Sequence, residues 1–321
     1  MELPPRLRQA VDRMLEGSSL SELQAAADLL SRRYRSETRD GRLHVSDASA
    51  AKAYLATRLP ATYAAIRKAI SDVAEAGGGS PKSLLDVGAG PGTALWAAME
   101  EWPDIEQAAL IETSSAMREA GERLAQELAP VRLSWRDLAV EGGLPGIERA
   151  DLVTLCYVLD ELEPAAAEVL VGRLWSLTKA TLLVVEPGTP AGWRRILKAR
   201  QRLIQAGAHI LSPCVHQLSC PIAEPDWCHF SRRVARSRLH RLAKGGEVPW
   251  EDEKFIYLAA SRDAAELRGS RVLAPAKAAS GMVRLKLCSP AGKVEERLVT
   301  RREGAAFKIA KRLDWGDLLE E

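Results

Sequence analysis

The sequence predicts an α/β protein whose core is a doubly wound parallel sheet. Between residues 83 and 187, short apolar segments alternate with segments of helical periodicity, which is the pattern of parallel strands joined by crossover helices. A glycine-rich loop follows the first apolar segment and opens its helix. The chain has 321 residues, of which 46% are hydrophobic and 27% charged. It is therefore long enough for a large core, and disordered and fibrous classes are excluded.

Residues 1–78 are expected to form a helical region that precedes the sheet. Apolar residues recur at helical spacing in four segments, namely LRQAVDRML, LSELQAAADLLSRRY, AAKAYLATRL and TYAAIRKAISDVAEA. Pro60 lies between the last two and is expected to break the third helix there. Three consecutive glycines and a Ser-Pro step follow at residues 77–81 and mark the boundary of the region.

Residues 79–265 are expected to hold the sheet. The predicted strands are SLLDVG, AALIET, VRLSWRDL, DLVTLCYVL and TLLVVEP. Helices are expected from Thr93 to Glu101, from Ser115 to Leu128 and after Pro164. A basic helix, WRRILKARQRLIQ, then breaks this alternation, and a later segment, KFIYLAAS, is expected to be a further strand.

Two further units complete the expected organisation. Residues 205–245 form an insertion that holds a loop with cysteines and histidines and a second basic stretch, SRRVARSRLHRLAK. Residues 266–321 are expected to form a small β unit. Its predicted strands are SRVLAPA, GMVRLKLCS, VEERLVT and AAFKIAKR.

The net charge of +2 conceals an uneven distribution. Residues 1–190 carry 20 basic and 28 acidic side chains, whereas residues 191–321 carry 25 and 15. A basic half most simply binds a polyanion, although solvated helix faces would have the same composition. Trp193 and Trp227 are expected to stack on unpaired RNA bases. The expected phosphate contacts are Arg194, Arg195, Lys198, Arg232, Arg233 and Arg236.

Localisation is predicted from what the sequence lacks. No apolar run approaches the ~18 residues of a membrane span, and the first residues lack the apolar core of a signal peptide. We therefore expect a soluble, cytoplasmic protein without a membrane partner. Its five cysteines are then reduced thiols, metal ligands or catalytic groups, because disulfide frameworks are rare in that compartment.

The segment LLDVGAGPGTALWAA is the most specific motif. A strand ends at Asp86, and a loop with Gly88, Gly90 and Gly92 leads into a helix whose N-terminus carries positive potential. A dinucleotide-binding loop would place its third glycine one residue later. The form D-x-G-x-G-x-G resembles the first motif of seven-stranded S-adenosylmethionine methyltransferases, and the resemblance implies that this loop, with Ala89, binds that cofactor.

Two carboxylates follow at the ends of the next predicted strands. The same resemblance places Glu112 where a carboxylate accepts both ribose hydroxyls, and Asp137 where one accepts from the adenine amino group. The plainer alternatives are a tight turn without a ligand for the glycine loop and a helix N-cap for Asp137.

The catalytic residues stay unassigned. The segment after the fourth strand lacks the Asn/Asp-Pro-Pro-aromatic loop of enzymes that methylate base amines. Cys156 lies in an apolar strand without an adjacent proline, so it is expected to be a buried core thiol rather than a nucleophile. Asp160 and Glu161 are candidates for a base or for a contact to the methionine amine, but a carboxylate pair that opens a helix is more often a cap.

Four of the cysteines suggest a metal site. Cys214, Cys220 and Cys228 are separated by five and seven residues, and Cys288 follows fifty-nine residues later. Four thiolates hold either zinc or an iron–sulfur cluster, and spacing this wide favours a cubane cluster over a zinc ribbon. His216 and His229 are rival ligands, and ordinary buried cysteines are the alternative without metal.

These motifs occur in one order that resembles a known family. The glycine loop, Glu112, VVEPGTPAGW, the cysteine loop and the distal KLCSPAG and LDWGD segments are similar to those of the mitochondrial ribosomal small-subunit methyltransferase-like proteins (the methyltransferase-like seventeen family) and their bacterial relatives. The resemblance runs from about Ser83 to Gly316. It implies a seven-stranded methyltransferase core and a [4Fe-4S] cluster on the four cysteines.

The resemblance also implies a role. We expect a protein that binds S-adenosylmethionine and the ribosomal RNA of the small ribosomal subunit, acts in assembly of that subunit or in rRNA methylation, and is a monomer when free. Two alternatives stay open: a non-catalytic iron–sulfur assembly factor, and a small-molecule methyltransferase with a zinc-clipped lid. The N-terminal residues do not resemble a mitochondrial transit peptide, so a bacterial member is expected.

Overall fold

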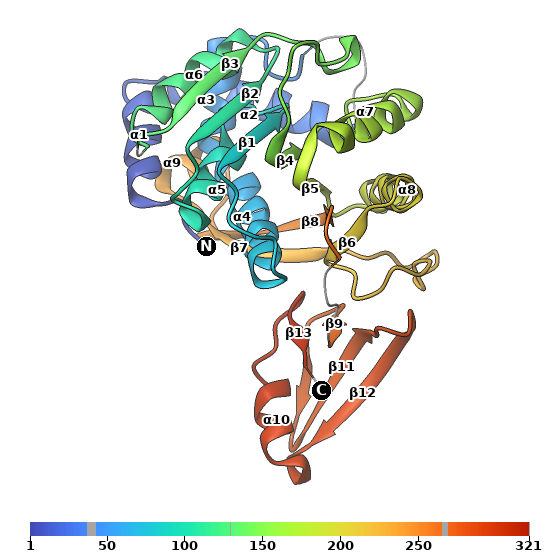
Figure 1. Cartoon of the computed structure of the whole chain (residues 1–321). Coiled ribbons are helices and arrows are strands. Elements are labelled where there is room, and N and C mark those ends of the chain that lie inside the picture. The colour runs from blue at the N-terminus through green and yellow to red at the C-terminus, as the bar shows by residue number, and fades with distance from the viewer. Residues whose placement is uncertain (37–42, 129, 265–268, 321) are drawn as a thin grey trace.

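The computed structural model describes residues 1–36, 43–128, 130–264 and 269–320. Its centre is a mostly parallel sheet in the order β3-β2-β1-β4-β5-β8-β6, with β7 also beside β8 (Figure 1). The strands from β1 to β5 are mutually parallel, and β8 runs antiparallel to β5, β6 and β7. The predicted α/β class is thus confirmed. The strands are β1 (Ser83–Val87), β2 (Gln107–Ile111), β3 (Arg132–Arg136), β4 (Ala150–Cys156), β5 (Thr178–Pro187), β6 (His209–Ser212), β7 (Phe230–Ala235) and β8 (Trp250–Ser261).

This sheet has eight strands rather than the seven expected. Two short strands, β6 and β7, take the place of one long strand beside β8. The strand β6 pairs with the end of β8, and β7 pairs with its beginning. Residues 213–229, which contain three of the cysteines, leave the sheet between them. The cysteine loop therefore interrupts a sheet edge and stays attached to it at both ends.

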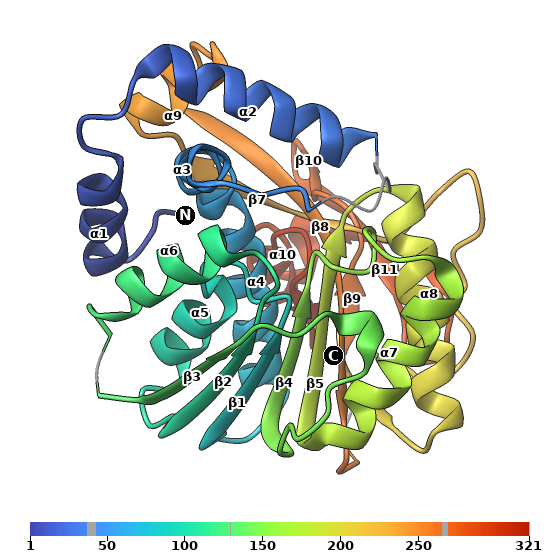
Figure 2. The same cartoon turned by 90° about the horizontal axis from the view of Figure 1, so that it is seen from above.

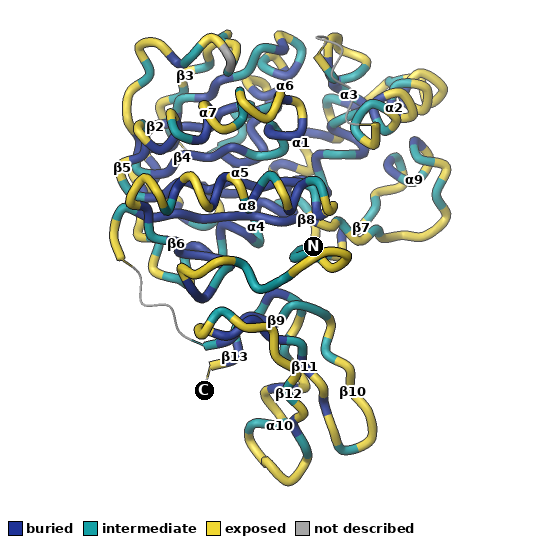
Figure 3. The backbone as a smooth tube through the Cα atoms, turned by 90° about the vertical axis from the view of Figure 1, so that its right-hand side faces the viewer, coloured by how far each residue is buried: buried dark blue, intermediate teal, exposed yellow. Residues whose placement is uncertain are grey.

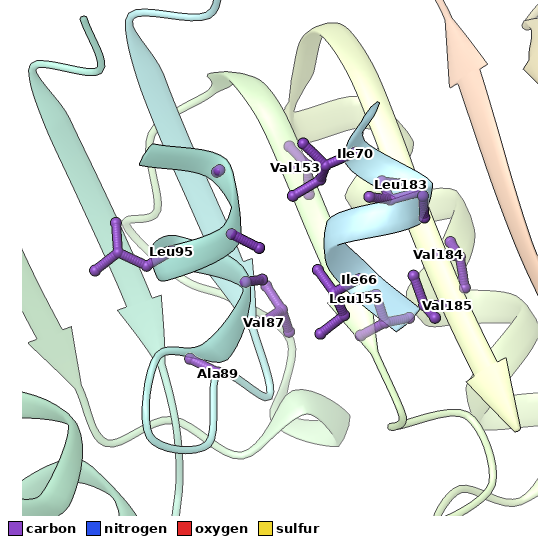
Figure 4. Packing of buried hydrophobic residues seen from close by; sticks show 14 of the residues in the cluster. Ile66, Ile70, Val87, Ala89, Leu95, Val153, Leu155, Leu183, Val184 and Val185 are labelled. Atoms are coloured by element: carbon purple, nitrogen blue, oxygen red, sulfur yellow. The ribbon is translucent and has the colours of Figure 1, made fainter. Parts of the chain in front are cut away.

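Helices cover both faces of the sheet (Figure 2). The helices α4 (Leu59–Glu75) and α5 (Thr93–Glu101) lie on one face, and α7 (Pro164–Leu177) and α8 (Pro190–Gln205) lie on the other. Figure 4 shows Ile66 and Ile70 of α4 packed over β4 and β5. Strands covered on both sides need apolar residues at successive positions, which explains the fully buried run from Leu182 to Val185 in β5.

Helices precede the sheet, as expected, with one local correction. They are α1 (Pro5–Leu15), α2 (Leu20–Arg35), α3 (Ala48–Thr57) and then α4. The break expected at Pro60 comes slightly earlier in the chain: α3 ends at Thr57, and Pro60 lies in the first turn of α4. Proline is favoured there because a first-turn N–H has no partner within the helix. In the part of the chain that the structure describes, no helix is both long and apolar enough to cross a membrane.

The C-terminal unit projects from the sheet edge formed by β6 and β8 (Figure 1). Its core contains Val283, Leu285 and Val299. The segment AAFKIAKR, predicted as a strand, forms a helix over its first six residues, and this helix packs Phe307 and Ala310 against the unit's core. The expected boundary at residues 265 and 266 lies outside the described residues. The elements are β9 (Ser270–Val272), β10 (Lys277–Ala279), β11 (Met282–Cys288), β12 (Val294–Thr300), η2 (Arg301–Glu303), α10 (Ala305–Ala310) and β13 (Leu318–Leu319).

Three further helices complete the described chain. Each connects two strands of the main sheet along the chain. They are α6 (Ser115–Ala125), η1 (Val140–Gly142) and α9 (Arg238–Lys244).

Candidate functional site

The glycine loop adopts the backbone that its sequence demands. Gly88, Gly90 and Gly92 have φ values of 68°, 54° and 80°, which residues with a side chain rarely adopt. A Cβ atom at Gly88 would lie 2.3 Å from Cγ2 of Val158, so this position has no room for a side chain. The loop therefore turns sharply between β1 and α5 and brings its backbone against the segment after β4.

A cavity of about 530 Å³ opens beside this loop, at the carboxyl ends of β1, β2 and β4. Ligands of doubly wound sheets bind at this edge. Three of the predicted cofactor residues, Gly88, Gly90 and Glu112, line the cavity. Asp86, in β1, and Ala89 and Gly92, in the loop, are not part of the described lining.

Glu112 is held at the cavity wall by backbone groups of two different loops. The N–H of Gly90 donates to Oε2 at 2.8 Å, and the N–H of Ser114 donates to Oε1 at 2.8 Å. Burial raises the pKa of this carboxyl, and these hydrogen bonds oppose the shift. Each carboxylate oxygen can accept a further hydrogen bond, so Glu112 is positioned to accept from the vicinal hydroxyls of a ribose.

Asp86 lies behind the cavity in the sheet. Its side chain is buried, and Oδ1 accepts from the hydroxyl of Thr154 at 2.7 Å. Oδ2 has no partner among the described residues. Burial, with a contribution from the charge of Glu112, raises the pKa of Asp86 to about 7. An orphaned buried oxygen of this kind indicates a water or ligand donor that completes it.

Asp137 is placed differently from its predicted role. Its side chain is 66% exposed and pairs with Arg118 at 3.0 Å, and the described cavity lining contains Leu138 and Ala139 but not Asp137. Arg118 also donates to the carbonyls of Glu112 and Thr113. The sequence reasoning missed Arg118, which joins the loops that follow β2 and β3.

Residues from the N-terminal helical region also line this cavity. Tyr34 from α2, His44 from the loop and Tyr54 from α3 belong to its lining. The rings of Tyr34 and His44 stack with centroids 4.8 Å apart. Sequence reasoning missed all three, because no local pattern connects a residue before the sheet to a pocket made by the sheet.

Two adjacent carboxylates, Asp160 and Glu161, lie in the segment that follows β4. Glu161 lines the cavity, and burial together with the charge of Asp160 raises its pKa to about 8. Nε2 of His44 lies 3.8 Å from its Oε1. Cys156 packs against the core of the sheet, as expected of a core thiol, but it is only half-buried because it also lines the cavity.

The four predicted cysteine ligands line a second cavity, between α8, β8 and the C-terminal unit. The Sγ atom of Cys288 lies 3.4 Å from Nε2 of His216, which shares that lining. Burial, reinforced by the neighbouring thiols, raises the pKa of Cys288 to about 12. Within the described ranges, no three His, Cys, Asp or Glu side chains are arranged to hold one metal ion. The fold thus brings the cysteines together, but a metal-binding insertion is not shown.

His229, the other rival ligand, is engaged elsewhere. Its ring stacks on Trp227 at a centroid distance of 5.0 Å and meets Trp315 edge-on at 4.6 Å. Trp193, expected to stack on RNA, is only 4% exposed and packs in the interior. That expectation is wrong because Trp193 lies on the sheet-facing side of α8. The indole N–H of Trp227 donates to the carbonyl of Gly188 at 3.0 Å.

The predicted phosphate contacts are mostly engaged within the protein. Lys198 alone of the six has no ion pair among the described residues. The other five have these carboxylate partners: Arg194 with Glu224 at 2.7 Å, Arg195 with Glu186 at 2.7 Å, Arg232 with Asp314 at 3.4 Å, Arg233 with Asp252 at 2.9 Å and Arg236 with Glu251 at 2.8 Å.

Comparisons with known proteins agree with the predicted family. The family model described as mitochondrial small ribosomal subunit Rsm22 matches residues 48–320. The human mitochondrial ribosome assembly protein METTL17 is 27% identical over 293 residues, which cover 83% of this chain and 61% of that protein. The mitochondrial Rsm22-cox11 tandem protein 2 of Schizosaccharomyces pombe is 23% identical over 319 residues, or 83% and 42% of the two chains. The chain thus spans about half the length of the curated relatives it matches.

Those relatives correct one prediction. Their names place them in mitochondria, which contradicts the expectation of a cytoplasmic protein. That expectation rested only on the composition of the first residues. The correction comes from the names of the relatives, which this composition does not reveal.

Two solved structures are examples of those to which this chain is similar. The magnesium protoporphyrin IX methyltransferase of Synechocystis PCC 6803, solved with bound SAH, is 14% identical with a TM-score of 0.43, covering 75% of this chain and 100% of that one. An O-methyltransferase family protein from Burkholderia thailandensis is also 14% identical, with a TM-score of 0.44, covering 76% and 71%.

Proposed function

The chain belongs to the family of the mitochondrial small ribosomal subunit protein Rsm22, and from this premise we propose that it acts in assembly of the small ribosomal subunit as a protein that binds S-adenosylmethionine and ribosomal RNA. One observation carries the cofactor part of the proposal. The Glu112 carboxylate is fixed by the N–H groups of Gly90 and Ser114 at the wall of a cavity beside a glycine loop. A nucleoside with a free ribose diol fits this arrangement.

The residues around the cavity fit the rest of this cofactor. Glu112 would accept from the ribose hydroxyls, and Gly88 and Gly90 leave room for the ligand against the loop. The orphaned Oδ2 of Asp86 would accept from a water or an ammonium group of the methionine part. The bound cofactor supplies an electrophilic methyl group. The contribution of the chain is to orient that group and to exclude water from it.

One feature favours a role without methyl transfer. Tyr157 stands directly after β4, at the start of the segment where the base-methylating enzymes named above carry their Asn/Asp-Pro-Pro-aromatic loop, and this segment has no Pro-Pro step. Its hydroxyl donates to Glu253 at 3.2 Å, and Glu253 also pairs with Arg58 at 3.4 Å. A ring anchored in this way is not free to receive a base. A non-catalytic assembly factor with a structural cofactor is therefore the second candidate.

For the cysteine cavity we propose a [4Fe-4S] cluster held by Cys214, Cys220, Cys228 and Cys288. Support comes from the donor set, because four thiols line one apolar cavity and soft ligands select such clusters. One zinc ion needs its sulfurs at about 2.3 Å and hence close to one another, whereas each cysteine of a cluster binds a different iron.

Calorimetric titration with S-adenosylmethionine tests the cofactor site. Glu112→Gln places an amide NH₂ where one oxygen now accepts from a backbone N–H, so we expect affinity to fall by about 10- to 100-fold, the equivalent of one or two lost hydrogen bonds. The exposed neighbour on α6, Glu119→Gln, serves as the matched control. A wild-type chain that does not bind the cofactor, or a Glu112→Gln variant of unchanged affinity, would overturn the assignment.

A second measurement separates the two candidate functions. Purified protein is incubated with immature small ribosomal subunits and methyl-labelled cofactor, and label in RNA and sedimentation with the subunits are followed together. Label that depends on Glu112 supports methyl transfer, and sedimentation without label supports the non-catalytic role. Failure to sediment with the subunits would overturn the ribosomal assignment.

A further inference from the structure

The end of the C-terminal unit carries a concentrated positive charge. Residues 301–312, which run from η2 through α10, contain five basic side chains and one acidic side chain. All five basic residues are exposed, and none of them forms an ion pair within the described part of the chain. We call this set the cationic tip; it consists of Arg301, Arg302, Lys308, Lys311 and Arg312.

Local structure turns these charges outward. Glu303, the one carboxylate of the segment, accepts from the N–H and the hydroxyl of Thr300 in a capping box. Its carboxylate therefore caps the start of η2. The short helix α10 turns Phe307 and Ala310 toward the core of the unit, which leaves Lys308 and the residues after the helix on the solvent side. Figure 3 shows this end of the unit largely in the colour of exposed residues.

The position of the tip makes it accessible to a large partner. The unit projects away from the main sheet, and α10 lies near its far end (Figure 1). A shallow hollow next to α10 is lined by Gly281, Thr300, Arg301 and Arg302. Two guanidinium groups thus border a depression whose other walls are a glycine and a hydroxyl-bearing residue, which leaves room for a phosphate group.

The basic residues of the cationic tip differ from most of the predicted phosphate contacts in having no carboxylate partners among the described residues. This difference indicates which surface binds a polyanion. Five of the six arginines and lysines predicted to bind phosphate, between residues 194 and 236, already have carboxylate partners. An RNA phosphate would have to displace those carboxylates. At the cationic tip it would displace only water and counterions, and release of counterions is the main source of nucleic-acid affinity.

We propose that the cationic tip is the surface through which this chain holds the phosphate backbone of RNA. The inference deepens the proposed function and rests on it, since the RNA meant is that of the small ribosomal subunit. Guanidinium and ammonium groups recognise phosphate without reading sequence. The tip therefore supplies affinity and orientation, and it leaves sequence recognition to other contacts.

The test measures binding of the full chain to a transcript of small-subunit ribosomal RNA across a series of salt concentrations. The variant Arg301→Gln/Arg302→Gln removes two charges from an exposed segment. We expect at least about tenfold weaker binding at low salt, and a slope of log Kd against log salt reduced by about 1.4 to 1.8, since each lost phosphate contact accounts for about 0.7 to 0.9. The matched control is Arg232→Gln/Arg233→Gln, in which both lost charges are paired with carboxylates; its slope is expected to change by less than half as much.

Three other outcomes would contradict the proposal in different ways. A wild-type chain that binds the transcript without salt dependence contradicts RNA binding itself. Salt-dependent wild-type binding with an unchanged slope in the tip variant overturns the tip alone. A tip variant that keeps RNA affinity but no longer sediments with small subunits shows that the tip contacts ribosomal protein, which also overturns the proposal. Thermal unfolding of both variants confirms that the fold is intact.

Discussion

At the scale of the single residue, Asp86 makes the stability of the ligand-free protein depend on pH. Its pKa in the fold is about 7, against about 3.9 for an aspartate in an unfolded chain. Between these values the folded state binds more protons than the unfolded state, so stability falls as the pH rises. The difference of about 3 between the two pKa values corresponds to a loss of up to about 4 kcal/mol in the free energy of unfolding.

Asp86→Asn is expected to remove this dependence while the amide oxygen still accepts from Thr154. The measurement is the free energy of unfolding in denaturant at pH 5 and pH 8. We expect the wild type to lose stability relative to the variant as the pH rises. Asp137→Asn, at an exposed carboxylate that pairs with Arg118, should follow the wild type. Parallel pH profiles of the wild type and Asp86→Asn would show that Asp86 is ionised at both pH values.

The residues of the candidate site differ in how far the sequence could predict them. Glu112 was predictable because a carboxylate directly after a strand must lie at the sheet edge beside the glycine loop. Asp137 satisfies the same rule, yet the nearby Arg118 pairs with it at the surface, and a guanidinium six residues beyond Glu112 gives no local signal. His44 joins the site through the packing of helices far from it in sequence, which no periodicity encodes.

At the scale of the element, strands were predicted where burial alone determines them. The strands β1, β4 and β5 are covered on both faces and so show continuous apolar runs. The division between β6 and β7 was not predicted, because each pairs with a different part of β8 and neither shows a pattern of its own. The helix α10 was mistaken for a strand, since six residues are too few to separate the two periods.

The C-terminal unit depends on a small core of its own, and this gives a prediction for β11. Val283 is fully buried among few neighbours, so Val283→Ala is expected to cost about 1–3 kcal/mol through lost burial and a residual cavity. Hydrogen exchange should show lost protection in residues 270–319 and little change in the main sheet. Leu298→Ala on β12, where the side chain is 48% exposed, is the control. Lost protection throughout the chain would instead show that the unit and the sheet unfold together.

At the scale of the whole molecule, the cysteine loop is where the sheet and the C-terminal unit meet. Arg271 of the unit is buried and donates to the carbonyls of Pro213 and Gly316. Lys286 of β11 pairs with Asp226 of the loop. Apolar contacts cross the junction as well, since Trp315 of the unit packs against the core of the main sheet and meets the ring of His229 edge-on. A metal centre with ligands from both parts would add to the order at this junction.

Cys288→Ser tests that junction, because it removes the one cysteine that the C-terminal unit contributes. We expect the anaerobically purified variant to lose iron and the visible absorption of the cluster, and to become sensitive to protease between the sheet and the unit. Cys156→Ser changes the fifth cysteine, which lines the cavity beside the glycine loop, and should keep the wild-type metal content. A wild-type protein without iron would contradict the cluster, and zinc in its place would identify the other metal. If Cys288→Ser kept both its metal and its protease resistance, the C-terminal unit would not be held through this cavity.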